Sequence, residues 1–249
     1  MDITVPRDTW AYWYDIINTE PREDYQFYSS LLDSNDTALE VACGTGRIYL
    51  RMLEDGYNVH GLDISEHMIQ RLRNKASEMD LEIPRLYQQD ISNLDSEQDY
   101  NLIYYPFNSI AHITGGVENQ KQTMNAIYQH LTEDGVFAFD IFVVDPEIMA
   151  KYEEVKSVEF EHDGTQYKFE TWSEIESLPE QTISSKNRII DLSTTDIVWD
   201  ADHVLSVYTK QQLELLLQQA GFSDISVYDE FTMEPLQDDS KQMSVIARK

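Results

Sequence analysis

The sequence predicts a doubly wound α/β fold, with a mostly parallel sheet of seven strands and an antiparallel β insertion. Three observations support this fold class. Apolar strand patterns alternate with helical patterns up to about residue 144, a glycine turn follows the first strand, and the alternation stops over residues 151–204. Strands that alternate with helices form parallel sheets covered on both faces. A chain of 249 residues with 41% hydrophobic content suits one domain, residues 1–249, with an insertion.

The helices and strands can be assigned in order. Residues 10–32 are helical in pattern and rich in aromatics, and we expect an N-terminal helical lid over residues 1–34. Apolar residues at helical spacing then predict three helices, with Ser65 as the cap of the second and a stop at Gly56 after the first. The segments read as strands are ALEVA, YNVHGLDI, PRLYQQDI, DYNLIYYPF and VFAFDIFVV, and those read as helices are RIYLRMLEDG, SEHMIQRLRNKASEM and ENQKQTMNAIYQHL.

Residues 151–204 have a different rhythm. Asp163 and Gly164 stand between two alternating segments, which indicates a hairpin. We expect this region to be an antiparallel insertion that shapes a pocket or a homodimer contact, and the sequence does not choose between them. A helix should then start at Thr209 and close at Gly221, followed by two strands, FSDISVYDEF and KQMSVIARK, as a terminal hairpin of the same sheet.

Composition excludes several classes of protein. Lys and Arg number 18 against 46 Asp and Glu, a formal net charge of −28, which disfavours nucleic acid as a partner. The acids are spread along the chain, so we expect an acidic surface of the kind found in proteins adapted to high salt. No apolar run is long enough for a membrane span and no secretory signal is evident, so a cytoplasmic location is expected. Cys43 is the only cysteine, and the histidines show no metal spacing, so no metal site is expected.

The glycine turn lies in LEVACGTGR, residues 39–47. A dinucleotide fingerprint would have a third glycine where Tyr49 stands, and no phosphate-loop pattern follows. What remains is a short turn with Glu40 on the strand before it. Gly44 allows close approach of a ligand, and the helix start offers N–H groups to an anionic group. The alternative is a tight strand–helix connection without a ligand.

Two further acids follow strands. Asp63 ends the second strand and can accept both hydroxyls of a ribose, or cap the next helix instead. Met68 could cover a flat base, although ordinary core packing is the better explanation of this residue taken alone. Asp90 ends the third strand, where it can accept from an exocyclic amine while the Ile91 N–H donates to a ring nitrogen. Carboxyl ends of such strands are where open α/β sheets bind ligands.

These motifs together resemble those of class I S-adenosylmethionine-dependent methyltransferases, which have a Rossmann-like fold. LEVACGTGR, GLDIS-EHM, QQDIS and the segment after DYNLIYYPF carry the resemblance over residues 39–143, and Ala42 departs from the glycine of many members. The resemblance implies S-adenosylmethionine as cofactor, with the following contacts: Glu40, Ala42 and Gly44 around its methionine part, Asp63 at the ribose, Ile64 and Met68 beside adenine, Asp90 and Ile91 at the adenine edge, and the Tyr105 carbonyl at its ammonium.

The methyl acceptor is expected to be a small molecule. The motif of nucleic-acid amino methyltransferases is absent after the fourth strand, and FNSIAHI resembles small-molecule N-methyltransferases, including those acting on amino sugars. By that resemblance His112 and Tyr14 lie near the reacting amine, and Tyr25 contacts the cofactor. A neutral His112 could accept the amine proton. If the residues after Pro106 are helical, Asn108 and His112 share a face.

Each of these residues also has a structural reading. His112 could be an ordinary loop residue, Tyr14 a packing or lid residue, and Cys43 a small buried side chain. We expect methyl transfer to nitrogen by direct displacement. The alternatives are a non-catalytic S-adenosylmethionine-binding module and a nucleotide-cofactor oxidoreductase, which the missing third glycine disfavours.

Overall fold

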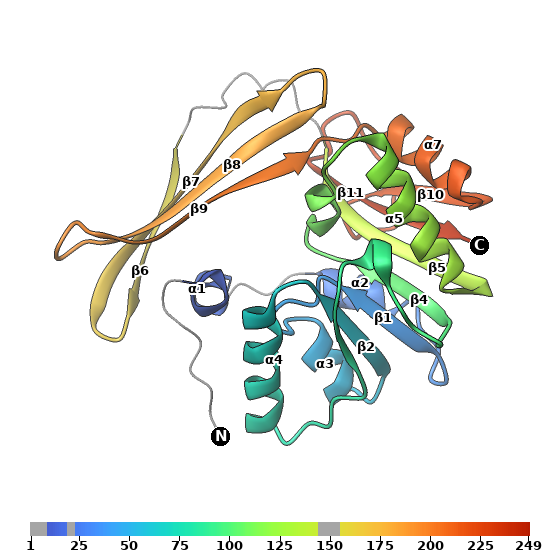
Figure 1. Ribbon diagram of the computed structural model, residues 1–249, viewed down its shortest axis with the longest axis horizontal. Coiled ribbons are helices and arrows are strands. Elements are labelled where there is room, and N and C mark those ends of the chain that lie inside the picture. Colours follow the sequence, from blue (N-terminus) through green and yellow to red (C-terminus); the bar gives the residue numbers. More distant parts are fainter. Residues whose placement is uncertain (1–8, 19–22, 144–154) are drawn as a thin grey trace.

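The computed structural model describes residues 9–18, 23–143 and 155–249. Its main sheet has seven strands in the order β10-β11-β5-β4-β1-β2-β3, all parallel except β11, which runs antiparallel to both of its neighbours (Figure 1). This confirms the predicted fold class. The strands are β1 (Thr37–Val41), β2 (Asn58–Asp63), β3 (Leu86–Gln88), β4 (Tyr100–Tyr105), β5 (Leu131–Phe142), β10 (Asp224–Asp229) and β11 (Gln242–Arg248).

Helices cover both faces of this sheet (Figure 1). Leu39 and Val41 of β1 belong to a core cluster with α5 (Val117–Gln129) and α7 (Lys210–Ala220). Ala38, on the other side of the same strand, packs in a cluster with α2 (Asp24–Ser29), α3 (Tyr49–Glu54) and α4 (Glu66–Glu78). Successive strand residues point to opposite faces, so alternate positions of one apolar strand serve two cores.

The predicted helix caps are present. The Ser65 hydroxyl accepts the Met68 N–H at 3.3 Å, and Thr209 and Gln212 form a capping box at the start of α7. Gly221 ends α7 in the left-handed region, with φ of 116°. The caps fix where the chain leaves each strand and enters the helix that follows.

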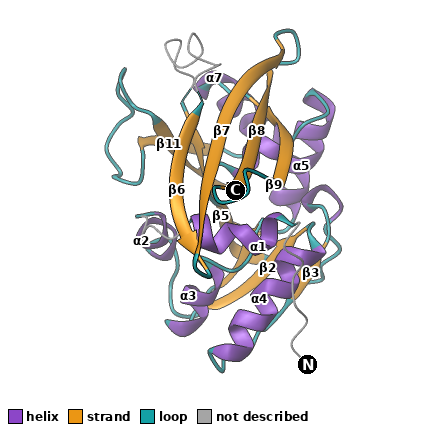
Figure 2. Cartoon of the chain, turned by 90° about the vertical axis from the view of Figure 1, so that its left-hand side faces the viewer, coloured by secondary structure: helices purple, strands orange, loops and turns teal. Residues whose placement is uncertain are grey.

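The insertion is a separate antiparallel sheet, in the order β6-β7-β8-β9. Asp163 and Gly164, with φ of 51° and 75°, form the predicted two-residue hairpin turn between β6 and β7. The first helix, α1 (Trp10–Ile17), packs beneath the sheet through Trp13, which is 1% exposed (Figure 2). The strands are β6 (Lys156–His162), β7 (Thr165–Ser177), β8 (Thr182–Asp191) and β9 (Ile197–Ser206).

Parts of the predicted lid (residues 1–8 and 19–22) and the start of the predicted insertion (residues 151–154) lie outside the described residues. Within the described ranges, no helix combines the length and apolar character needed to cross a membrane. The residues after Pro106 form a short 3-10 turn, η2 (Ser109–His112), and Asn108 precedes it in the left-handed region with φ of 56°. The condition for Asn108 and His112 to share an α-helical face is therefore not met.

Candidate active site

The carboxyl ends of β1, β2 and β4 lie beneath the antiparallel sheet and beside α1 (Figure 1). A cavity of about 930 Å³ is lined by residues from the parallel sheet, from α1 and from the antiparallel sheet. Of the twelve residues predicted for the site, all except Tyr25 line it: Tyr14, Glu40, Ala42, Gly44, Asp63, Ile64, Met68, Asp90, Ile91, Tyr105 and His112.

The glycine turn opens one wall of the cavity. Gly44 has φ of 55°, and a side chain added there would meet only the Ala42 carbonyl oxygen at 3.9 Å. Gly46 is different, because a Cβ there would lie 2.8 Å from Leu50 and 2.9 Å from Leu72. Gly44 therefore leaves room on the cavity side, whereas Gly46 lets α3 and α4 pack close to the turn.

Asp63 is held by backbone groups. Its two carboxylate oxygens accept the Gly44 N–H and the Ser65 N–H, each at 2.8 Å, and the residue is only 7% exposed. Burial raises the pKa of Asp63, and these N–H groups oppose the increase. Asp63 does not cap α4, because Ser65 does. It links the glycine turn to the end of β2, with lone pairs left on each oxygen.

The walls near Asp63 are apolar. Ile64 is 72% exposed, which is unusual for a large aliphatic side chain beside a buried carboxylate. Asp90 also lines the cavity, and its Oδ1 accepts the N–H and the hydroxyl of Ser92 at 2.8 and 2.7 Å. It thereby caps the short 3-10 turn η1 (Ile91–Asn93). A flat apolar group with polar edges fits between these walls.

Glu40 is the most deeply buried acid at the cavity. It is 2% exposed and accepts a hydrogen bond from the Tyr104 hydroxyl at 2.7 Å. Burial raises the pKa of Glu40 to about 8, and the bond from Tyr104 acts in the opposite direction. A cationic group bound beside Glu40 would favour its charged form. Cys43, 3% exposed on the same turn, has a pKa raised by burial, so it is a packing thiol.

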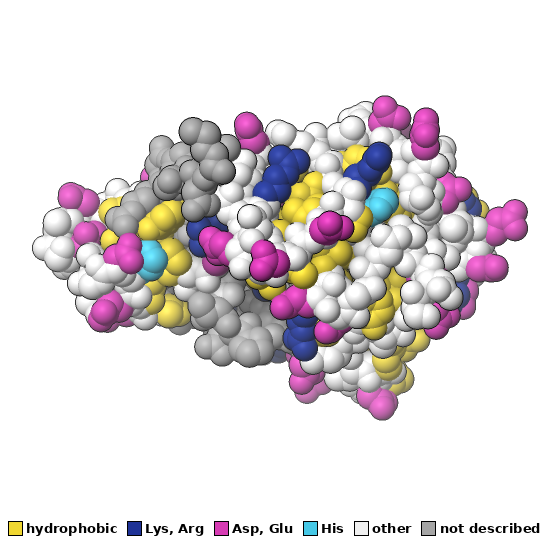
Figure 3. Space-filling view, turned by 90° about the horizontal axis from the view of Figure 1, so that it is seen from below, with side chains coloured by type: hydrophobic (Ala, Val, Ile, Leu, Met, Phe, Trp, Pro, Cys, Tyr) yellow, Lys and Arg dark blue, Asp and Glu magenta, His cyan; other side chains and the backbone are white. Residues whose placement is uncertain are grey.

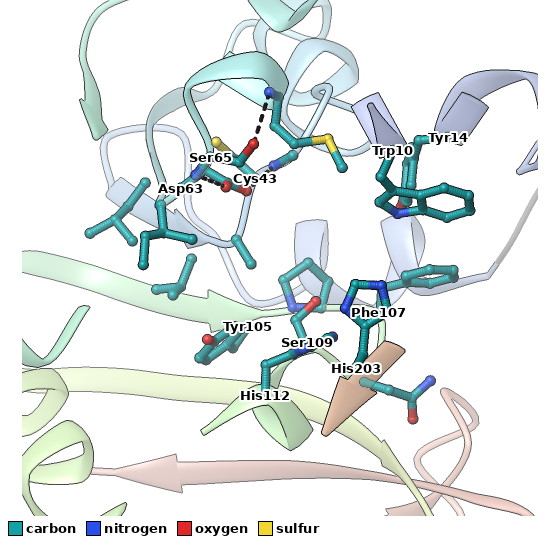
Figure 4. A pocket seen from close by; sticks show the side chains of 18 of the residues that line it. Trp10, Tyr14, Cys43, Asp63, Ser65, Tyr105, Phe107, Ser109, His112 and His203 are labelled. Atoms are coloured by element: carbon teal, nitrogen blue, oxygen red, sulfur yellow. Dashed lines mark hydrogen bonds between the residues drawn. The ribbon is translucent and has the colours of Figure 1, made fainter. Parts of the chain in front are cut away.

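The far end of the cavity is aromatic. Trp10 stacks on Trp199 with centroids 4.7 Å apart, and Tyr14 meets Trp10 and Phe107 edge-on at 5.7 and 6.1 Å. His112 from η2 also borders this end, and Figure 4 shows it facing His203. Partial desolvation within the cavity and the neighbouring His203 lower the pKa of His112.

Three ion pairs, made by two carboxylates, attach the N-terminal helices to the site. The Asp15 carboxylate on α1 accepts hydrogen bonds from Thr45 at 2.6 Å, Arg71 at 2.9 Å and Lys75 at 3.1 Å. Arg47, which lines the cavity, donates two hydrogen bonds to Asp24, which is 1% exposed, at 2.5 and 3.0 Å. The guanidinium charge next to the cavity is thus compensated within the protein.

Tyr25 does not reach the cavity. Its hydroxyl donates to Asp55, and the Arg51 guanidinium lies 3.8 Å above its ring. Burial, followed by the bond to Asp55, raises the pKa of Tyr25 to about 12. The prediction that Tyr25 contacts the cofactor is therefore not supported by its position: α2 turns this side chain towards α3 because Asp55 and Arg51 there offer it both a hydrogen bond and a cation–π contact.

Asp140 is a site residue that the sequence reasoning missed. It is fully buried on β5 and accepts the N–H groups of Phe107 and Asn108, at 2.7 and 3.0 Å, in a segment where both residues have positive φ. The Tyr28 hydroxyl and the Gln242 amide donate to the same carboxylate. A charge within the apolar run VFAFDIF was the available signal. Asp140 holds the strained turn that leads to His112.

Comparisons with known proteins agree with this geometry. Residues 32–221, more than half of the chain, match the family described as "Methyltransferase domain". The chain belongs to this family, as its motifs predict. It shares the fold of an S-adenosylmethionine-dependent methyltransferase of Clostridium acetobutylicum, with a TM-score of 0.77 at 20% identity over 95% of this chain and 96% of that chain. The match gives the oxidoreductase alternative no support.

Three similar proteins illustrate the range. A protein of Geobacillus sp. (strain WCH70), named provisionally as a methyltransferase, is 30% identical over 141 residues, covering 54% of this chain and 56% of that protein. A glycine/sarcosine N-methyltransferase of Aphanothece halophytica is 23% identical over 255 residues, covering 95% and 86%. The CcbJ methyltransferase of Streptomyces caelestis has a TM-score of 0.78 at 21% identity, with 98% of each chain covered, and shows the shared fold. The chain spans about half the length of the first curated relatives it matches.

Proposed function

We propose that this protein transfers a methyl group from S-adenosylmethionine to a nitrogen atom of a small molecule. One observation supports the proposal above all others. A single cavity contains the glycine turn with Asp63 and Asp90 at one end and His112 among aromatic side chains at the other. A donor and an acceptor bound at these ends would face each other, which is the alignment that displacement needs.

The residues at the first end fit the cofactor. Asp63 has free lone pairs for ribose hydroxyls, exposed Ile64 offers an apolar face to adenine, and Gly44 leaves open space for the methionine part. Glu40 and the Tyr105 carbonyl would hold the ammonium, and Asp90 with the Ile91 N–H the adenine edge. When bound, S-adenosylmethionine supplies a methyl group on a positively charged sulfur.

The chain itself would prepare the acceptor nitrogen. A protonated amine has no lone pair, so its proton must leave before methyl transfer. His112 borders the cavity as a neutral imidazole and is placed to take that proton. Tyr14, on the lid helix, closes the same space together with Trp10. Both assignments rest on position, and substitution tests them.

The charge of the acceptor end favours an amine without a carboxylate. Among the described residues that line the cavity, Arg47 is the only Lys or Arg, and Asp24 already accepts hydrogen bonds from its Nη1 and Nη2 atoms. Aromatic faces such as those of Trp10 and Trp199 attract ammonium groups and the apolar faces of rings. In this respect we expect the acceptor to differ from the acids named for the glycine/sarcosine relative.

Surface charge supports a small acceptor over a nucleic acid. The net charge is −28, and Figure 3 shows acidic side chains dispersed over one face with few Lys and Arg among them. Phosphate backbones would be repelled by such a surface. A cytoplasmic location, a homodimer contact through the insertion and the boundaries of the lid stay predictions.

Calorimetry and methyl release test the proposal in two steps. We expect S-adenosylmethionine to bind. We also expect the demethylated form of S-adenosylmethionine to appear when the protein is incubated with a panel of primary and secondary amines, including amino sugars. Glycine and sarcosine should be poor acceptors. Binding without turnover on any amine, acid or phenol would favour the non-catalytic module, and absence of binding would refute the cofactor assignment.

A further inference from the structure

A second histidine faces the acceptor end of the cavity. His203 lies on β9 of the insertion, and its ring centroid is 5.9 Å from that of His112, with the ring planes at 82°. Both residues line the cavity, and Figure 4 shows the two rings together on the side opposite Asp63. This pair could not be predicted from local patterns, because 90 residues separate its members.

The structure fixes the pair through the residue next to His112. The Ile113 carbonyl accepts hydrogen bonds from the Ser206 hydroxyl at 2.8 Å and the Tyr208 hydroxyl at 3.1 Å. Both donors are nearly fully buried, at 3% and 2% exposed. The end of β9 is therefore attached to the η2 turn, and the separation of the two imidazoles is set by the fold.

Charges around the pair favour one proton at a time. Desolvation lowers the pKa of both rings, and His203 lowers the pKa of His112 further. Asp202, next to His203 in the chain, opposes the decrease in the pKa of His203. Two protonated rings this close would repel each other. The other titratable or charged residues that line the cavity are Tyr14, Glu40, Cys43, Arg47, Asp63, His67, Asp90 and Tyr105.

We propose that His203 acts through His112, as a positioning residue that receives the proton which His112 removes from the acceptor. This proposal rests on the proposed function. The N–H bond of the acceptor ammonium breaks, its electron pair stays on nitrogen, and the proton moves to a ring nitrogen of His112. It then passes to a ring nitrogen of His203, directly after a small rotation or through one bridging water, and leaves to solvent. His112 is neutral again for the next turnover.

Histidine NMR titration tests the pair without any acceptor. In the unmodified protein the two rings should titrate in separate steps. In His203→Gln, His112 should titrate in one step, at a pH higher by about 0.5–1 unit. This is the effect of removing the repulsion from a second charge roughly 6 Å away, at a dielectric constant between those of protein and water. His130, bonded to the Ala126 carbonyl outside the cavity, provides the control His130→Gln. An unchanged His112 titration in His203→Gln would overturn the proposal.

Kinetics with an amine from the panel provide the second measurement. At pH values below 7, His203→Gln should lower kcat about tenfold, which is less than the loss of a general base itself because His112 remains in place. It should move the acid limit of kcat/KM to higher pH and leave the affinity for S-adenosylmethionine unchanged. A pH profile identical to that of His130→Gln would contradict the relay. If no amine reacts, the proposed function fails, while the NMR titration still decides whether the rings share a proton.

Discussion

The carboxylate of Asp15 accepts a hydrogen bond from the Thr45 hydroxyl, 2.6 Å away, and so joins helix α1 to the glycine turn. Arg71 and Lys75 of α4 bind the same carboxylate. Helix α1 also carries Trp10 and Tyr14 on the acceptor side of the cavity. One residue thus connects the lid helix to the place where the cofactor is proposed to bind.

Asp15→Ala should loosen this connection. We expect the affinity for S-adenosylmethionine to fall about tenfold, because α1 no longer holds Thr45, and KM for an amine to rise as Trp10 and Tyr14 become mobile. Calorimetry and steady-state kinetics measure the two effects. Glu118→Ala, which removes an exposed ion pair with Lys121, is the control. Equal values for both variants would mean that the contact has no functional role.

Asp63→Ala should weaken cofactor binding most. It removes the acceptor of the Gly44 and Ser65 N–H groups and the proposed ribose contact. Hydrogen bonds to a charged group contribute about 1.5–3 kcal/mol, so we expect an affinity loss of about 10- to 150-fold. Asp99→Ala, at an exposed position, serves as the reference. If Asp63→Ala binds S-adenosylmethionine as tightly as the reference variant does, Asp63 does not contact the cofactor.

Glu40 should make cofactor binding depend on pH. Its pKa of about 8 in the folded protein means that it is protonated at pH 7, and pairing with an ammonium requires the proton to leave. Affinity should rise from pH 6 to 8, by up to about tenfold per unit, with proton release in calorimetry. Glu40→Gln should bind more weakly and lose this dependence. If the affinity of Glu40→Gln still depends on pH in the same way, a group other than Glu40 causes the pH dependence.

The same carboxyl affects folding. An unfolded Glu loses its proton near pH 4.5, whereas folded Glu40 keeps it until about pH 8. The unfolded chain therefore binds fewer protons between these values, and the contribution of Glu40 to stability decreases as pH rises through this window. Denaturant unfolding of the unmodified protein and Glu40→Gln from pH 5 to 8 should converge at the acid end and differ increasingly towards pH 8.

Asp140→Ala should destabilise the fold strongly. Four donors, from Tyr28, Phe107, Asn108 and Gln242, would lose their buried acceptor. We expect a loss of about 3–5 kcal/mol in the free energy of unfolding, as for removal of one partner from a buried charged network. Asp134→Ala, at an exposed position of the same strand, should change it little. Similar denaturant midpoints for both variants would show that the network is not needed for folding.

Salt should stabilise the protein. With a net charge of −28, self-repulsion weakens the compact state at low ionic strength, and screening reduces it. We expect the unfolding temperature to rise between low and molar sodium chloride. A higher unfolding temperature in potassium chloride than in sodium chloride at the same concentration would indicate specific ion binding in addition to screening. A flat response would argue against adaptation to high salt.

Local patterns were sufficient to predict the parallel sheet and most of the residues that line the cavity near Asp63. Asp63 ends β2, Ile64 follows it, and Asp90 lies two residues after β3, so the periodicity that places a strand also places the residues at its tip. The Asp163-Gly164 turn was predictable for the same reason, since φ above zero at two successive positions demands such residues.

The acceptor end was less predictable because it is assembled from distant segments. His203 meets His112, Trp199 meets Trp10, and Asp140 holds Asn108, and each pair depends on how two sheets and a helix pack. Tyr25 differs from the other predicted residues because it lies outside the cavity. Its hydroxyl donates to Asp55 and the Arg51 guanidinium lies over its ring, contacts that its place in the sequence did not indicate.

The two sheets contribute different residues to the cavity, and this has an evolutionary consequence. The strands of the antiparallel sheet contribute Trp199 and His203 to the cavity, while the strand ends proposed to bind the cofactor belong to the other sheet. Under the proposed function, residues 156–206 can diverge and alter which acceptor is bound while the donor half stays intact. Relatives with a common donor site and unrelated substrates are the expected result of such divergence.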